Sequence, residues 1–362
     1  MTHWLGGARW VATPMLLLGC LAPLRGGSGL TVAAPPELWA TIWKRELLVA
    51  EPVLVRLELS NPSTEPLAVV PPYVNVWGLT AWPLAFTITD EAGRRVPSGW
   101  EYARTGFEPI CFGAPWWIAA GGPGRPPLRE AWQLPAGGRG WMWIDLLQFY
   151  PLDEPARYHV VFQYDAQPEM LVSLGWTEPP PEGVWSGHLE ADAEWITVHE
   201  PGDADRDAAQ FLLERRDKLQ AVLSAGAYGV APAVLERFPQ AAHALYAAFY
   251  QHWSPGVFGG PPATGAEKLA ASAAGFAREH PEFPLNYQLP VAAALSQWQV
   301  AAEVVLMAAG MGMEPTEEMV ARAAERRGVL REAAAVARDY SLMQMVEDRI
   351  SLLAVPGMAT AP

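Results

Sequence analysis

Residues 53–63, VLVRLELSNPS, decide the fold of the first half of this chain. Apolar valine and leucine side chains alternate with Arg56 and Glu58, so the apolar and charged side chains lie on opposite faces of an extended strand. The Asn-Pro-Ser that closes the stretch is typical of a turn. We therefore predict a half-buried strand over 53–59, with one face in a hydrophobic core.

Six other segments of the first half show comparable short apolar or alternating runs between turn signals. They are residues 38–43, 67–70, 85–89, 141–146, 158–164 and 195–199. No helical period separates these runs, and several short strands joined by turns are typical of an antiparallel β-sandwich. We expect that architecture from residue 29 to residue 202.

The order of four segments resembles a known class of domain. AEPVLVRLELSNPS (50–63), TITDEAGRRV (87–96), LDEPARYHVVFQYD (152–165) and VWSGHLEADAEWITV (184–198) are similar to the immunoglobulin-like sandwich of exported bacterial proteins and of BsuPI-type proteinase inhibitors. The resemblance spans residues 38–200 and rests on structural marks, which carry no activity by themselves. The chain departs from the compact pattern by a Pro-, Gly- and Trp-rich insertion within residues 100–140. In an inhibitor, residues 106–128 would form the exposed loop.

The second half has helical periodicity. Apolar residues recur at three- and four-residue steps from Asp203 onward, and we expect helices around 203–223 and 244–249 and over 267–280, 289–307 and 316–345. Pro281 and Pro284 would end one helix, and Thr316 would cap another. The stretch 273–295 is similar to a junction between tetratricopeptide repeats, but no 34-residue period accompanies it. We predict an all-helical domain over 203–352 and a flexible tail over 353–362.

The N-terminus indicates export. Arg9 precedes an apolar run that is too short to span a membrane, a pattern typical of a signal peptide within residues 1–28. Leu17-Leu18-Gly19-Cys20 resembles a bacterial lipobox, which makes Cys20 the candidate lipidation site. The alternative is cleavage near 26–28 and release into the periplasm or medium. No later apolar run approaches 18 residues, so we predict no transmembrane span in the mature chain.

Composition excludes several partner classes. The formal net charge is −14 and no basic run occurs, so nucleic acid and anionic membrane surfaces are poor partners. The two cysteines, Cys20 and Cys111, cannot form a disulfide framework or a cysteine-rich zinc site, and we interpret Cys111 as a buried thiol. The abundance of Ala, Pro, Gly and Arg is typical of a GC-rich bacterial genome.

One acidic pattern has the spacing of a calcium loop. Asp203, Asp205, Asp207 and Glu214 stand at positions 1, 3, 5 and 12 of an EF-hand. Ala208 replaces the glycine of position 6, and acids also favour the start of a helix. We therefore prefer a helix cap and keep calcium as the alternative. The histidines lack metal-binding spacing, no catalytic or nucleotide motif occurs, and we expect no cofactor.

Tryptophan supplies the remaining ligand-binding candidates. Fifteen of the 17 tryptophans precede residue 200. Trp116 and Trp117, inside the insertion, point to opposite sides of an extended chain, so one of them could be exposed. Trp141 and Trp143 share one strand face, and we expect them in the core.

We interpret the chain as a non-enzymatic binding or scaffolding protein of the cell envelope, with an envelope protein or polysaccharide as partner. The helical array would offer the protein-binding surface. A proteinase inhibitor and a carbohydrate-binding or carbohydrate-active protein are the alternatives.

Overall fold

Strand β3 (Leu54–Ser60) is the centre of a three-stranded antiparallel sheet, here called sheet A. Its neighbours are β1 (Glu37–Ile42) and β9 (Arg139–Asp145). Val55, Leu57 and Leu59 are buried, whereas Arg56 and Glu58 lie on the opposite face. The alternation in the sequence therefore sets which face of this sheet enters the core. The computed structural model describes residues 34–70, 73–74, 81–82, 84–97, 132–148, 150–167, 183–192, 194–216, 230–258 and 265–353.

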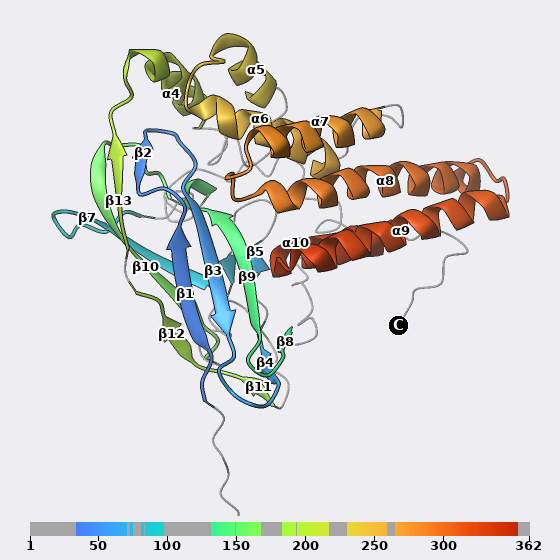
Figure 1. Ribbon diagram of the computed structural model, residues 1–362, viewed down its shortest axis with the longest axis horizontal. Coiled ribbons are helices and arrows are strands. Elements are labelled where there is room, and N and C mark those ends of the chain that lie inside the picture. The colour runs from blue at the N-terminus through green and yellow to red at the C-terminus, as the bar shows by residue number, and fades with distance from the viewer. Residues whose placement is uncertain are drawn as a thin grey trace, which may run out of the picture. The chain divides into compact units, whose positions relative to one another are not determined.

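Sheet B forms the second layer of strands (Figure 1). Its longest strand is β10 (Ala156–Asp165), which pairs along one edge with β7 (Leu84–Asp90). Along the other edge β10 pairs with β13 (Glu194–His199) and then β12 (His188–Glu190). Strand β2 (Glu46–Leu48) adds to β13 in the parallel direction.

Short strands complete the first half. They are β4 (Leu67–Val69), β8 (Trp132–Leu134) and β11 (Val184–Trp185), which form one sheet, and β5 (Tyr73–Val74) and β6 (Ala81–Trp82), which form another. A 3-10 turn, η1 (Leu146–Gln148), follows β9. All seven predicted strands are present, with ends within two residues of those expected.

Helices follow the last strand. The structure has α4 (Asp203–Arg216), α5 (Val230–Arg237), α6 (His243–Phe258), α7 (Ala266–Glu279), the 3-10 turn η3 (Asn286–Gln288), α8 (Leu289–Gly310), α9 (Glu317–Ala337) and α10 (Tyr340–Leu352). The chain is thus a mixed α and β protein with antiparallel sheets first and helices mostly towards the C-terminus. Thr316 caps α9 through a hydrogen bond from the Met319 amide, as predicted. The expected helix over 316–345 is instead two helices, since Arg338 adopts a left-handed backbone (φ 53°) and Asp339 caps a new helix.

The strands and helices share a core. One cluster of buried apolar residues contains Val160 and Phe162 of β10 together with Tyr246 and Phe249 of α6 and Phe276 of α7. A second cluster fills the space among α8, α9 and α10. Ala34–Pro362 form one compact unit, and the change from strands to helices within it falls between His199 and Asp203. The division into a domain over 29–202 and a domain over 203–352 stays a prediction.

Helix α8 and the turn before it, Asn286–Gly310, are long and apolar enough to cross a membrane by length and composition. In the protein, 61% of the most apolar window is buried. Burial of that kind is expected of a core helix, so the composition of α8 decides nothing about a membrane.

Candidate functional site

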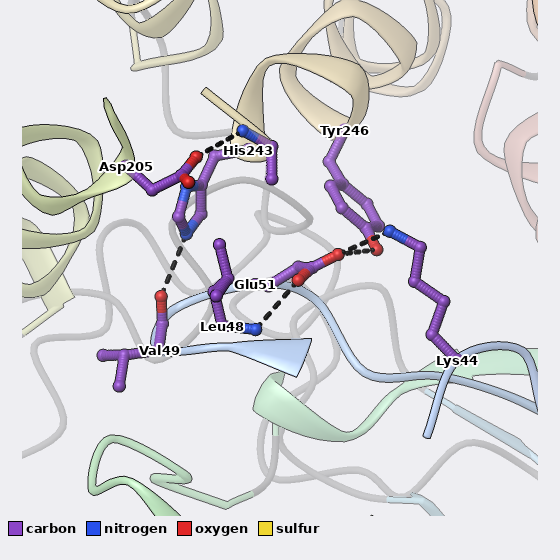
Figure 2. Close-up of polar contacts among 8 residues, drawn as sticks. Lys44, Leu48, Val49, Glu51, Asp205, His243 and Tyr246 are labelled. Carbon is purple, nitrogen blue, oxygen red and sulfur yellow. Dashed lines mark hydrogen bonds and ion pairs between the residues drawn. The ribbon is translucent and has the colours of Figure 1, made fainter. Parts of the chain in front are cut away.

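A buried carboxylate joins the strands to the helices. Glu51 follows the turn after β2, where Ala50 adopts a left-handed backbone (φ 64°), and its side chain is almost completely buried. Oε2 accepts a hydrogen bond from the Leu48 amide at 2.9 Å. Oε1 accepts from Lys44 Nζ at 2.8 Å and from the Tyr246 hydroxyl of α6 at 2.7 Å (Figure 2). Three donors thus compensate the buried charge.

Aromatic rings hold Lys44 in place at this junction. Its ammonium lies 5.0 Å from the centre of the Trp43 ring and 5.5 Å from that of Tyr246, within the range of a cation–π contact. Trp43 meets Tyr246 edge-on, with ring centres 6.0 Å apart. Burial, and then the negative charge of Glu51, raises the pKa of the Tyr246 hydroxyl far above its ordinary value of 10.0. Tyr246 therefore stays protonated and donates to Glu51.

His243 and Asp205 complete the same junction (Figure 2). His243 Nε2 lies 2.9 Å from the carbonyl oxygen of Val49, so Nε2 carries the proton that this contact needs. Asp205 of α4 accepts a hydrogen bond of 2.7 Å from the Ala242 amide, just before α6 begins. These contacts tie the starts of α4 and α6 to the turn after β2. We interpret the junction as a structural clamp, because its carboxylates already accept hydrogen bonds from the protein.

The outer face of sheet A carries an exposed aromatic group. Trp39 of β1 and Trp141 of β9 both pair in register with Glu58, so the three side chains form a row across the sheet. Trp39 is 54% exposed. The Arg56 guanidinium lies 4.7 Å from the centre of the Trp141 ring, and Glu58 forms ion pairs with Arg56 and Arg139. This row combines an exposed apolar ring with charged hydrogen-bonding groups.

The expectation that Trp141 and Trp143 lie in the core is wrong for Trp141, whereas Trp143 packs against the edge of the buried cluster. Both are half-buried and lie on the face opposite buried Met142 and Ile144. Trp141 stacks instead on Tyr287 of η3, with ring centres 5.8 Å apart. Tyr287 therefore covers one side of the Trp141 ring, a contact that the strand pattern alone does not reveal.

A second exposed apolar group lies at the α8–α9 turn. Val304, Met307, Met311 and Met313 are 39%, 59%, 69% and 53% exposed, and we call these four residues the hairpin tip. Figure 1 shows α8 and α9 side by side, with their connection at the end away from the sheets. Sequence reasoning missed the hairpin tip, although Val304, Met307 and Met311 stand at helical spacing on a face that the core does not use.

The calcium candidates do not form a loop. Asp203, Asp205, Asp207 and Glu214 all lie on the continuous helix α4. Asp203 pairs with Arg206 at 2.9 Å, and Glu214 accepts from Gln210 at 3.0 Å. Because these twelve residues are helical throughout, the spacing produces no EF-hand. Within the described part of the chain, no three His, Cys, Asp or Glu side chains are grouped so that they could hold a metal ion.

The histidines have separate surroundings. His199 pairs with Glu46, and His188 lies 3.4 Å from Asp165. Burial lowers the pKa of His252 below its ordinary value of 6.5. The candidates Trp116, Trp117 and Cys20, the buried-thiol interpretation of Cys111 and the insertion 106–128 fall outside the described residues.

No protein-family model matches the sequence, and no curated protein matches it either. Two exposed groups, the outer face of sheet A and the hairpin tip, are therefore the surfaces that indicate a function.

Proposed function

We propose that this chain is a non-enzymatic binding protein that docks a protein partner through the α8–α9 hairpin. The observation that carries the proposal is the exposure of four large apolar side chains at the hairpin tip. Grouped apolar side chains on a surface mark interaction sites far more often than scattered ones. Methionine is over-represented in surfaces that adapt to protein partners, because its unbranched side chain repacks easily.

The hairpin tip is also held in a defined shape, which favours binding. The Met313 amide donates to the Ala308 carbonyl and the Gly312 amide to the Ala309 carbonyl, and Gly312 takes a positive φ of 73°. This is the Schellman arrangement that ends helices. Thr316 then caps α9. A surface fixed before binding loses less conformational entropy when a partner docks.

Affinity capture tests this function. The full chain is immobilised and exposed to an envelope fraction of the native organism, beside a Met307→Gln/Met311→Gln variant and a Val336→Gln variant. Val336 is 76% exposed near the opposite end of α9, which makes it a matched control. We expect a protein that the wild type and Val336→Gln retain and the methionine variant releases. Equal retention by all three chains would refute docking at the hairpin tip.

A carbohydrate-binding function is the second candidate, and exposed Trp39 favours it. An indole at the edge of a sheet, beside Glu58 and Arg139, offers stacking and hydrogen bonds to a sugar ring. Recovery of a polysaccharide by the wild type, lost in Trp39→Ala, would support this function. Trp116 and Trp117 remain candidates for the same role. The proteinase-inhibitor alternative depends on residues 106–128, and no described residue adds support to it.

The immunoglobulin-like class of sheets A and B is part of the proposal. Its support is the strand order in the sequence and the core that the two sheets share. Export, with or without lipid on Cys20, is likewise proposed from the N-terminal sequence. Mass spectrometry of the native protein decides it: a diacylglycerol-modified N-terminal cysteine would establish the lipoprotein, and an N-terminus near residues 26–28 the released form.

A further inference from the structure

The residues around the hairpin tip specify its partner further, if the tip docks a protein as proposed. Val304 and Met307 lie on one face of the end of α8, and Met311, the residue that follows the helix, continues their three- and four-residue spacing. Met313 extends this apolar group past the turn. Buried Val305, the neighbour of Val304, packs in the core with Leu330 of α9, which anchors the exposed face to the rest of the bundle.

Acidic side chains surround the hairpin tip. Glu303, Glu314, Glu317 and Glu318 are all exposed. Glu303 precedes Val304 directly, and Glu314 follows Met313. Between Arg278 and Arg322 the sequence contains neither lysine nor arginine. Four glutamates therefore lie next to the apolar residues of the hairpin tip, and exposed Arg322, one turn after Glu318, is the first basic residue of α9.

This combination decides among three kinds of occupant. An anionic membrane and a second copy of the chain, which carries a net charge of −14, would both bring like charges together. A cationic partner would place opposite charges beside the four glutamates. A helical face with anchors at three- and four-residue steps is complementary to another amphipathic helix, whose own apolar stripe has the same spacing.

We infer that the hairpin tip binds a cationic amphipathic helix of a partner protein, with the apolar stripe of that helix on Val304, Met307, Met311 and Met313. Its lysine or arginine side chains lie beside the glutamates. The methionines supply the buried apolar area, and the glutamates select the charge of the partner.

The test uses fluorescently labelled peptides of about 16 residues, which is about four helical turns. The first contains leucine at i, i+3, i+4 and i+7 positions and lysine elsewhere. The second has the same composition in an order that destroys the apolar stripe. The third keeps the stripe but replaces lysine with glutamate. Fluorescence anisotropy measures the affinity of each peptide for the full chain.

We expect the first peptide to bind and the other two to bind at least about tenfold more weakly. The Met307→Gln/Met311→Gln variant should lose about tenfold or more of the affinity, because burial of a methionine side chain is strongly favourable. Glu303→Gln/Glu314→Gln should weaken binding severalfold and reduce its dependence on salt. Val336→Gln should leave the affinity unchanged. Circular dichroism of each variant confirms that its helices persist.

Different failures separate the inference from the proposed function. If the acidic or the scrambled peptide binds as well as the basic amphipathic one, or if the methionine variant retains full affinity, the inference is overturned. Self-association of the full chain that the methionine variant abolishes, or binding to phosphatidylglycerol vesicles, would also overturn it. If no peptide binds, while envelope capture still depends on Met307 and Met311, the inference fails and the proposed function stands. If no peptide binds and envelope capture does not depend on Met307 and Met311, both the inference and the proposed function are refuted.

Discussion

The Tyr246 hydroxyl donates a hydrogen bond of 2.7 Å to Oε1 of Glu51, from a residue that lies 195 positions away in the sequence. This contact fixes α6 on the turn after β2. Both residues are buried, so each supplies the polar partner that the other requires. The attachment of the helical half to the strands therefore depends on polar pairing as well as on apolar packing.

Removal of that donor should destabilise the fold. Tyr246→Phe keeps the ring contacts with Trp43 but leaves Glu51 with two donors. A hydrogen bond to a charged group contributes about 1.5–3 kcal/mol, and we expect urea denaturation to show a loss of that size in the free energy of unfolding. In the control, Tyr158→Phe, the hydroxyl donates to the neutral carbonyl of Glu154, so about 0.5–1.5 kcal/mol is expected. Equal losses in the two variants would contradict a special role for Glu51.

Alkaline titration should show that some tyrosines of the described residues ionise late. Burial raises the pKa of Tyr246 and of Tyr287 well above the ordinary 10.0, and the adjacent carboxylates Glu51 and Asp339 raise both further. The unfolded chain releases these protons near pH 10, so stability that is complete below pH 10 is lost progressively as the pH rises above it. We expect the tyrosinate absorbance of these two residues to appear only when the chain unfolds. Tyr246→Phe should remove one late ionisation, and a smooth titration of all tyrosines before unfolding would argue against this account.

The sequence was a good guide to local structure and a poor guide to contacts between residues that are distant along the chain. The seven predicted strands are present because alternation is a property of adjacent residues, whereas three-residue β2 and β12 are too short to show a period. The break between α9 and α10 escaped prediction for a different reason. Asp339 accepts a hydrogen bond from the Leu342 amide and another from the Tyr287 hydroxyl, which lies 52 residues earlier. A helix end that is stabilised by a residue distant in the sequence cannot be recognised from the residues next to it.

Dependence on contacts between distant residues also explains why the sequence revealed neither the clamp nor the surroundings of Trp141. Lys44, Glu51 and Tyr246 match no motif, because their grouping results from the docking of α6 on the strands. The sequence pattern predicts the correct strand for Trp141 and Trp143 and their shared face. Which face the sheet buries depends on its neighbours, and a single strand with large side chains on both faces does not specify this.

A negative charge at position 61 should destabilise the fold. The residue is completely buried, and its Nδ2 lies 2.9, 3.1 and 3.1 Å from the carbonyl oxygens of Glu65, Leu134 and Pro135. Asn61→Asp has the same shape but replaces this donor with an acceptor that faces three acceptors. The Ser63 amide and hydroxyl still donate to the other oxygen. We therefore expect a loss of about 1–3 kcal/mol or more, the cost of a buried polar group without its partner, measured by urea denaturation at neutral pH. Acidification should recover part of the loss, because a protonated carboxyl can donate. The exposed control Glu65→Ala should change stability by less than about 0.5 kcal/mol.

His252 should make the fold sensitive to mild acid. Burial depresses its pKa below 6.5, the value it regains in the unfolded chain. Stability is therefore complete above pH 6.5 and falls as the pH drops from 6.5 through the folded pKa, since the unfolded chain binds the proton more readily. The ring lies 6.0 Å from that of Phe276, so protonation also places a charge beside an aromatic cluster.

The measurement for His252 compares melting temperatures at pH 7.5 and at pH 5.5 for the wild type and for His252→Gln. Glutamine keeps a polar side chain of similar length and cannot titrate. We expect acidification to lower the melting temperature of the wild type more than that of the variant. Above pH 7 the melting temperatures of the two chains should respond equally to pH. His188→Gln is the matched control, because His188 is exposed and pairs with Asp165 across 3.4 Å. If the melting temperature falls further in His252→Gln than in the wild type, the prediction is wrong, and protonated His252 stabilises the fold.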